Sequence, residues 1–149
     1  MWHKWGVRMK IRKWLPGIMC LILLVGTAWS SETPRYSLLL QVSEDSLDKL
    51  NLALNNAKDV QKSFGPENIE VEIVVFGAGV HTLKYYAPAP ISDKVKAATY
   101  SGVRIVLCEI SMRAANLRPS DMLQSVRYVP SGVAEIVEKH TLGWTYIRP

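Results

Sequence analysis

The segment Ile69-Glu-Val-Glu-Ile-Val-Val-Phe76 decides the fold class of this chain, and Gly77-Ala-Gly79 follows it directly. The segment alternates apolar and acidic residues at first and then becomes wholly apolar, which is typical of a strand that enters a sheet covered on both faces. A second short apolar segment, Val103-Arg-Ile-Val-Leu-Cys108, has a similar character. Strands of this kind predict a parallel sheet with helices on both sides.

The segments on either side of these two strands complete an alternating pattern. Further strands are expected at residues 36–42, 125–129 and 144–147, and helices at residues 43–64, 92–100, 109–116 and 133–140. Strands that alternate with helices through short connections indicate a mostly parallel sheet. We therefore predict one α/β domain in residues 31–149, with a five-stranded sheet.

The first 30 residues have the pattern of a secretory signal peptide. A basic stretch without acidic residues is followed by an apolar stretch from Ile18 to Trp29. This stretch is shorter than the ~20 residues that span a bilayer. The small residues Ala28 and Ser30 suit cleavage before Ser31. We predict a periplasmic or secreted protein without a membrane partner after cleavage, and the alternative is an uncleaved N-terminal anchor.

The charge of the chain is concentrated in this leader. Residues 31–149 hold 13 of the 18 Lys and Arg residues and all 13 Asp and Glu residues, so they carry no net formal charge. Because binding to nucleic-acid phosphates needs clustered positive charge, we expect no nucleic-acid partner.

Cys108 is the only cysteine after the leader, so an internal disulfide cannot form. It ends a predicted strand and precedes a predicted helix, whose N-terminus favours a thiolate. The neighbouring Glu109 opposes this effect by adding negative charge. Cys108 is therefore either a reactive thiol or a small buried hydrophobe.

Other candidate residues follow predicted strands, where ligands bind in open α/β sheets. Gly77 and Gly79 allow a tight turn or a close approach of the backbone to a ligand. His81 can exchange a proton or simply be solvated. Ser131 and Gly132 form part of a ligand site, or Ser131 only caps the following helix. The sequence shows no metal-ligand spacing and no cofactor motif, so we predict neither.

Together these segments resemble the DsrE/DsrF-like family of small sulfur-relay proteins, and more closely its exported branch. The resemblance rests on residues 71–80, on the strand ending at Cys108 with Ser111-Met112 after it, and on residues 129–133 and 143–149. It implies a three-layer α/β/α sandwich that forms homo-oligomers. It also implies a cysteine that carries sulfur as a persulfide and passes it to a partner protein, and Cys108 is the matching position.

The sequence and the resemblance lead to one main functional hypothesis and two alternatives. The main hypothesis is an exported sulfur carrier in which Cys108 attacks a persulfide or polysulfide donor and later exchanges with an acceptor thiol. Such a protein is a carrier more than an enzyme with turnover. One alternative is a non-catalytic ligand-binding or assembly module with a buried, inert Cys108. Another is a redox-sensing thiol that forms an intermolecular disulfide.

Overall fold

The computed structural model describes residues 36–149, and the predicted signal peptide lies outside this part of the chain. Strands and helices alternate along it, as expected. The strands are β1 (Tyr36–Val42), β2 (Ile69–Val75), β3 (Arg104–Cys108), β4 (Arg127–Val129) and β5 (Thr145–Ile147). The α-helices are α1 (Leu47–Phe64), α2 (Ala89–Tyr100), α3 (Glu109–Ala114) and α4 (Gly132–Thr141), with the short 3₁₀ helices η1 (Gly77–Leu83) and η2 (Pro119–Asp121). No helix in residues 36–149 has the length and apolar character needed to cross a membrane.

The five strands form one sheet in the order β4-β3-β2-β1-β5, and every neighbouring pair is parallel. This confirms the prediction of a mostly parallel five-stranded sheet. Each of the strands β2 to β4 lies beside the strand that precedes it in the chain, whereas β5 crosses back to pair with β1. Because all strands run in the same direction, their carboxyl ends lie at one end of the sheet.

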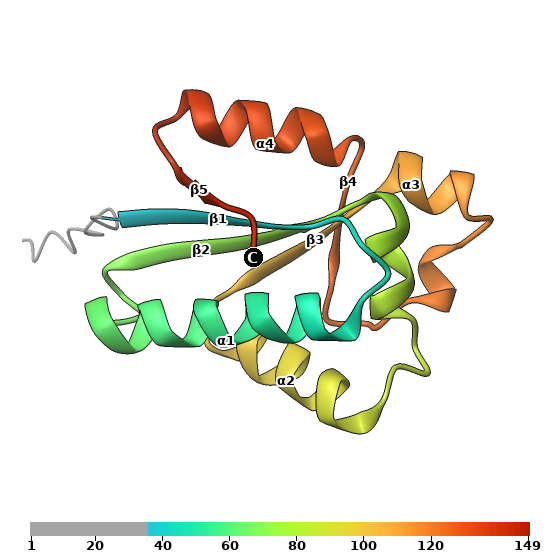
Figure 1. The fold of residues 1–149 in the computed structure, drawn as a ribbon, viewed down its shortest axis with the longest axis horizontal. Helices are drawn as coiled ribbons and strands as arrows, with labels where there is room; N and C mark the ends of the chain where they lie inside the picture. The colour runs from blue at the N-terminus through green and yellow to red at the C-terminus, as the bar shows by residue number, and fades with distance from the viewer. Residues whose placement is uncertain (1–35) are drawn as a thin grey trace, which may run out of the picture. The chain divides into compact units, whose positions relative to one another are not determined.

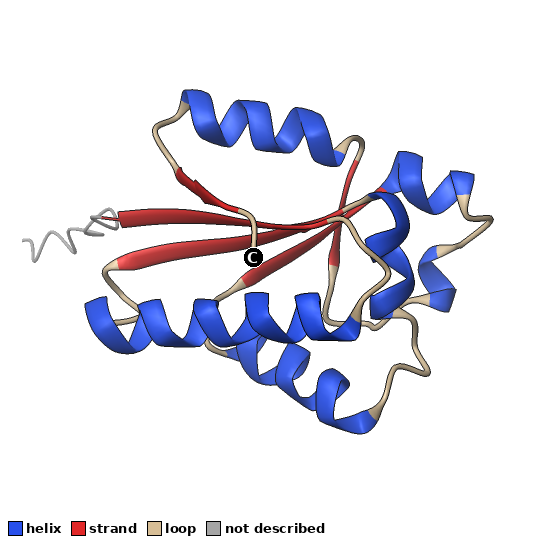
Figure 2. Cartoon of the chain, in the orientation of Figure 1, coloured by secondary structure: helices blue, strands red, loops and turns tan. Residues whose placement is uncertain are grey.

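Helices lie on both faces of the sheet, which makes the α/β/α sandwich expected above (Figure 1, Figure 2). Helices α1 and α2 cover one face, which we call the two-helix face. Helix α4 alone lies over β2 and β3 on the other face, which we call the one-helix face. Helix α3 follows β3 at the carboxyl ends of the strands and packs against η1.

The two faces bury different amounts of apolar surface. Side chains alternate between the faces along each strand, so Leu40 points to the two-helix face and Leu39 to the one-helix face. The two-helix face carries the main core, a cluster of 21 buried residues. The one-helix face buries a cluster of four: Leu39, Val74, Val106 and Trp144.

Two helices begin at positions other than those expected from the sequence. Helix α1 begins at Leu47 because Ser46 caps it and accepts a hydrogen bond from the Lys49 N–H at 3.3 Å. Helix α2 begins at Ala89, earlier than expected, and holds Pro90 in its first turn. Proline is tolerated there because its missing N–H has no partner in the first turn and its fixed φ suits a helix.

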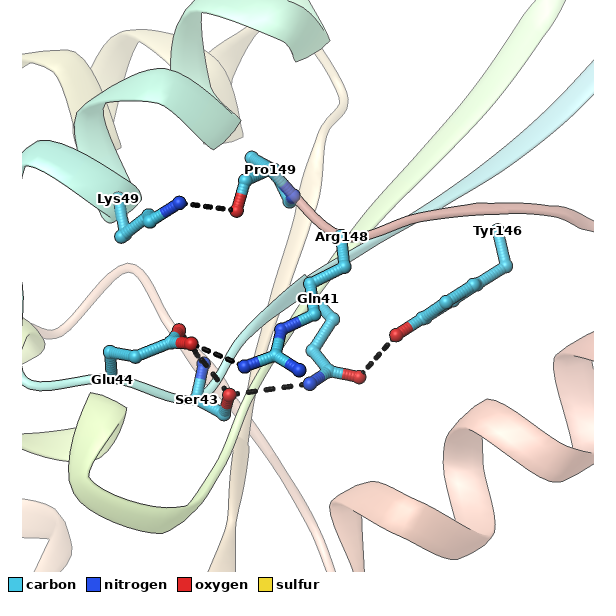
Figure 3. Close-up of polar contacts among 7 residues, drawn as sticks. All are labelled: Gln41, Ser43, Glu44, Lys49, Tyr146, Arg148 and Pro149. Atoms are coloured by element: carbon cyan, nitrogen blue, oxygen red, sulfur yellow. Dashed lines mark hydrogen bonds and ion pairs between the residues drawn. The ribbon is translucent and has the colours of Figure 1, made fainter.

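A polar network attaches the C-terminal end of the chain to the carboxyl end of β1 (Figure 3). The Tyr146 hydroxyl donates to Gln41 Oε1 at 2.5 Å, and the Arg148 guanidinium pairs with Glu44. The Lys49 ammonium donates to the Pro149 carbonyl oxygen at 3.0 Å. These contacts hold β5 beside β1. They therefore fix the C-terminal end of the segment that runs from β4 through α4 to β5.

Candidate functional site

Cys108 lies at the carboxyl end of β3 and is the N-cap residue of α3. Its backbone is extended, with φ −73° and ψ 114°, so the chain turns from strand to helix at this residue. The side chain shares the one-helix face with Val106, two residues earlier on the same strand. It is buried, with 4% of the residue exposed.

The sulfur of Cys108 faces backbone N–H groups from two helices. The Ser111 N–H donates to Sγ at 3.5 Å. Burial raises the pKa of the Cys108 thiol, but hydrogen bonds from the Ser111 side chain and from the N–H groups of Gly132, Ser111 and Ile110 outweigh it. The pKa is therefore lower than that of an ordinary thiol. Since these N–H groups belong to the first turns of α3 and α4, the site favours a thiolate.

Ser111 links the ends of β2 and β3. The sequence alone did not indicate a role for this residue at the site. Its Oγ accepts a hydrogen bond from the Gly77 N–H at 2.8 Å, which leaves the hydroxyl hydrogen available to the Cys108 sulfur. Gly77 has φ +56°, a left-handed conformation that favours glycine. The Cys-x-x-Ser spacing could have identified Ser111 as a site residue, because the third residue of a helix lies beside its N-cap.

Gly132 brings the first turn of α4 against the cysteine. A Cβ atom at this position would lie 3.2 Å from Cys108 Cβ, 3.0 Å from Phe76 Cβ and 3.3 Å from Val74 Cγ1. A side chain here would push these neighbours away by a few tenths of an ångström, so glycine suits this close packing. Gly132 therefore covers the thiol and at the same time provides one of its N–H donors.

The other predicted site residues have local structural roles. Gly79 packs against β1, since a Cβ there would lie 2.7 Å from the Val42 carbonyl oxygen. Ser131 caps α4 by accepting from the Ala134 N–H at 3.3 Å, as the capping interpretation expects. His81 lies half-buried in η1. The structure thus places Cys108, Gly132 and, through Ser111, Gly77 together.

The negative charge of Glu109 does not oppose the Cys108 thiolate in the way that its neighbouring position in the sequence suggests. Its carboxylate pairs with Arg113, one turn further along α3, at 3.5 Å. The Glu109 side chain is 47% exposed, so water and Arg113 both screen it. The influences that set the pKa of Cys108 are burial and the hydrogen bonds described above.

A buried charged cluster lies beneath α4 on the same face. The Glu72 side chain is only 2% exposed, and its Oε2 lies 2.9 Å from Arg104 Nε and 3.5 Å from Lys139 Nζ. Both cations also lie against the Trp144 ring. Within residues 36–149, Glu72 Oε1 and Arg104 Nη2 are buried without a hydrogen-bond partner. The contact between α4 and the sheet is therefore partly ionic.

The arrangement suits thiol chemistry. Among the residues that the structure describes, no group of three or more His, Cys, Asp or Glu side chains could hold a metal ion. A cysteine with a lowered pKa, N–H donors on its sulfur and a close helical cover can act as a nucleophile when the cover opens.

Solved structures with the same fold are known. The protein MTH1491 from Methanobacterium thermoautotrophicum, described as of unknown function, is 31% identical and aligns over 76% of this chain and 99% of its own, with a TM-score of 0.71. BT1422 from Bacteroides thetaiotaomicron, also described as of unknown function, aligns over 76% and 94% of the two chains (14% identity, TM-score 0.55). The ychN protein from E. coli aligns over 78% and 100% (13% identity, TM-score 0.60).

The family assignment rests on the whole described domain. No curated protein matches the chain. The model of the DsrE/DsrF-like family matches residues 37–149, which include every strand and helix described above except the first residue of β1. The chain therefore belongs to the DsrE/DsrF-like family.

Proposed function

We propose that this chain is a sulfur-relay protein that holds sulfane sulfur as a persulfide on Cys108 and passes it to a partner thiol. Family membership supports the general activity, because the DsrE-like family is associated with sulfur relay. The observation that carries the proposal is the environment of the Cys108 sulfur, which faces N–H donors from two helices and has a lowered pKa. The thiolate is the form that attacks sulfane sulfur.

The loading step is a sulfur transfer between thiolates. The Cys108 thiolate attacks the sulfane sulfur of a donor persulfide, so that a bond forms between Sγ and that sulfur. The sulfur–sulfur bond of the donor breaks, and the donor leaves as a thiolate with the electron pair. Attack of an acceptor thiolate on the outer sulfur of the Cys108 persulfide reverses the exchange and releases Cys108. Neither step needs an external oxidant or reductant.

Loading requires Cys108 to become accessible, because only 4% of this residue is exposed. The first turn of α4 is the cover, since Gly132 packs against the cysteine. Within residues 36–149, helix α4 is the only helix on its face, and it rests on a small apolar cluster, so it opens at a lower free-energy cost than α1 or α2. In this proposal, a partner protein reaches the sulfur when the first turn of α4 moves away.

The direct test is the intact mass of the purified protein after brief polysulfide treatment. We expect a gain of one sulfur, about 32 Da, which reductant removes. Cys108→Ser abolishes the gain. Ser111→Ala keeps the cysteine but removes the hydroxyl that lowers its pKa, so we expect the pH midpoint of Cys108 alkylation to rise and loading at neutral pH to slow.

Two results would contradict the sulfur-carrier proposal. One is a Cys108→Ser protein that still gains sulfur, because the sulfur would then lie elsewhere. The other is a Cys108 that reacts with small alkylating reagents only after the protein unfolds. The second result would support the alternative of a non-catalytic module with an inert cysteine, which the burial of Cys108 favours.

Export is a further part of the proposal. The basic and apolar pattern of the first 30 residues supports cleavage of a signal peptide before Ser31. N-terminal sequencing of the exported protein should then begin at or near Ser31. Retention of Met1 on a membrane-bound form would favour the uncleaved anchor.

Assembly into a homo-oligomer also belongs to the proposal. Val133 and Val137 are 58% and 60% exposed and lie one turn apart on the solvent side of α4. Exposed apolar residues that are grouped in this way mark contact surfaces more often than isolated ones do. Light scattering should show a homo-oligomer, and Val137→Lys should weaken it; a monomer at all working concentrations would contradict this part.

A further inference from the structure

A cavity lies far from Cys108, between α1 and α2 at the amino ends of the strands. Its volume is about 530 Å³, which is within the range of small-molecule sites. The apolar part of its wall consists of Leu54, Pro66, Ala97, Ala98 and Val103. Val103 immediately precedes β3, whereas Cys108 ends that strand, so the cavity and the thiol lie at opposite ends of the sheet. We call this cavity the α1–α2 groove.

Two hydrogen-bonded polar residues, Gln61 and Ser101, form one end of the groove. Gln61 is 8% exposed and is held by Ser101 through two hydrogen bonds. Its Nε2 donates to the Ser101 carbonyl oxygen at 2.8 Å, and its Oε1 accepts from the Ser101 hydroxyl at 2.9 Å. Both residues line the groove. This pair joins the end of α2 to α1 and keeps the two helices at a fixed separation, so the groove is part of the fold.

The charge of the groove is positive and lacks acidic partners. Lys58, Lys62 and Lys94 line it, and no lining residue is acidic. Within residues 36–149, none of these three ammonium groups lies within ion-pair distance of a carboxylate, which is also true of Lys49, Lys84, Lys96 and Arg127 outside the groove. Lys94 instead donates to the side-chain oxygens of Asn51 and Asn55. The positive charge of the groove is therefore uncompensated.

Helix dipoles explain only part of this charge. Helices α1 and α2 both end near the groove, and a cation in the last turn stabilises the carbonyl end of a helix. Lys62 lies in the last turn of α1. Lys58 and Lys94 lie six residues before the ends of their helices, beyond the reach of this effect. Both lysines line one apolar cavity, and an anionic ligand explains this position better than the helix dipoles do.

We infer that the α1–α2 groove binds a small amphipathic organic anion, such as an alkyl or aryl carboxylate. The apolar body of the ligand lies against the wall of Leu54, Ala98 and Val103, and its anionic head lies among the three lysines. A carboxylate gains three ammonium partners there, and the buried apolar body provides most of the binding free energy. This inference is independent of sulfur chemistry at Cys108.

The test is titration calorimetry of the purified protein with dodecanoate below its micelle-forming concentration. We expect one dodecanoate per chain, with binding that weakens as salt is added. Dodecyltrimethylammonium, which has the same apolar chain and the opposite charge, should bind at least about tenfold more weakly. Cys108→Ser should bind dodecanoate as the wild type does, which separates this test from that of the sulfur-carrier proposal.

Variants of the residues that line the groove test whether dodecanoate binds there. The double variant Lys58→Gln/Lys62→Gln should weaken dodecanoate binding about tenfold. Lys84→Gln/Lys96→Gln is the matched control, because it also removes two positive charges, from residues that do not line the groove. Ala97 is exposed, so Ala97→Trp can fill the groove without disturbing the core, and it should abolish binding.

Three outcomes would overturn the inference. Dodecanoate and dodecyltrimethylammonium that bind equally would show general hydrophobic adsorption. Unchanged binding by Ala97→Trp would place the site elsewhere. Binding to vesicles of anionic phospholipid without binding of monomeric dodecanoate would assign the lysines to a membrane surface.

Discussion

The two faces of the sheet differ in how they are covered and in what they carry. The two-helix face is covered by α1 and α2 over a cluster of 21 buried residues. The one-helix face is covered by α4 over four buried residues and a buried carboxylate, Glu72. Cys108 lies on this second face. The chain thus buries most of its apolar core on one face and places Cys108, the residue that we propose to be reactive, on the other.

The difference matters because a fully packed face would keep the thiol inaccessible. A helix that rests on few apolar residues has a low free energy of local opening. The ionic contact of Lys139 with Glu72 holds α4 in place, but it contributes less than a well-packed apolar contact of similar size.

The largest effect is expected from two adjacent leucines of β1. Leu40 and Leu39 are both fully buried, on the two-helix and the one-helix face respectively. Leu40→Ala should lower the free energy of unfolding by about 4 kcal/mol, because the dense cluster cannot collapse into the cavity. Leu39→Ala should cost about 2–3 kcal/mol, because α4 can settle toward the sheet. Urea unfolding measures both values, and equal losses would mean that the faces are equally rigid.

An intermediate effect is expected from Gly132→Ala. The added Cβ meets the Cβ atoms of Phe76 and Cys108, which cannot rotate away, so the first turn of α4 must shift. We expect a loss of about 1–3 kcal/mol in the free energy of unfolding. We also expect Cys108 to be alkylated about tenfold faster under native conditions, since 1.4 kcal/mol of easier opening corresponds to this factor.

Leu40→Ala is the control for this alkylation experiment. It destabilises the protein at least as much, but on the face that does not cover the thiol. Its alkylation rate should stay close to that of the wild type. If both variants are alkylated equally fast, Cys108 becomes accessible through global unfolding and α4 is not a local cover.

The smallest effect is expected from the pH dependence of Glu72. Burial raises the pKa of this carboxyl group above its ordinary value, although Lys139 and Arg104 oppose the shift and Glu135 adds to it. The folded protein therefore binds this proton more tightly than the unfolded chain does. The contribution to stability is fully present below the ordinary pKa of about 4.3 and is lost as the pH rises through the raised pKa.

Glu72→Gln removes this titration while keeping the size of the side chain. The wild type should lose stability relative to Glu72→Gln as the pH is raised from about 4 toward neutral. Urea unfolding of both proteins over this range measures the difference. Two parallel stability profiles would show that Glu72 has the same pKa in the folded and unfolded states.

Local patterns in the sequence predicted much of the fold and the position of the main site residue. The apolar run ending at Phe76 predicted β2, and the patterns on either side of Cys108 placed it at the end of a strand and immediately before a helix, as observed. The cap at Ser131 followed from its residue type. These features depend on neighbours within a few residues, which a sequence displays directly.

Contacts between distant segments could not be predicted in this way. The Gly77 N–H and Ser111 Oγ are 34 residues apart, and their bond forms only because β2 and β3 pair side by side. The need for a small residue at position 132 depends on the side chains of Val74, Phe76 and Cys108, which belong to two distant segments of the chain. The alternating pattern around Glu72 did not indicate which acidic residue is buried, because the burial of this carboxylate depends on the distant helix α4, which returns over the sheet.

The pairing of β5 with β1 has a consequence for the order in which the chain folds. Tyr146 and Gln41, which meet in this pairing, are 105 residues apart, whereas β2, β3 and β4 each pair with the strand that precedes it in the chain. Contacts between such distant residues form late, because a long loop must close first. Strands β1 to β4 can therefore assemble into a sheet while the C-terminal residues are still being synthesised. Helix α4 can cover Cys108 only after residues 132–141 have been made, so a newly made chain passes through a stage in which α4 does not cover the thiol.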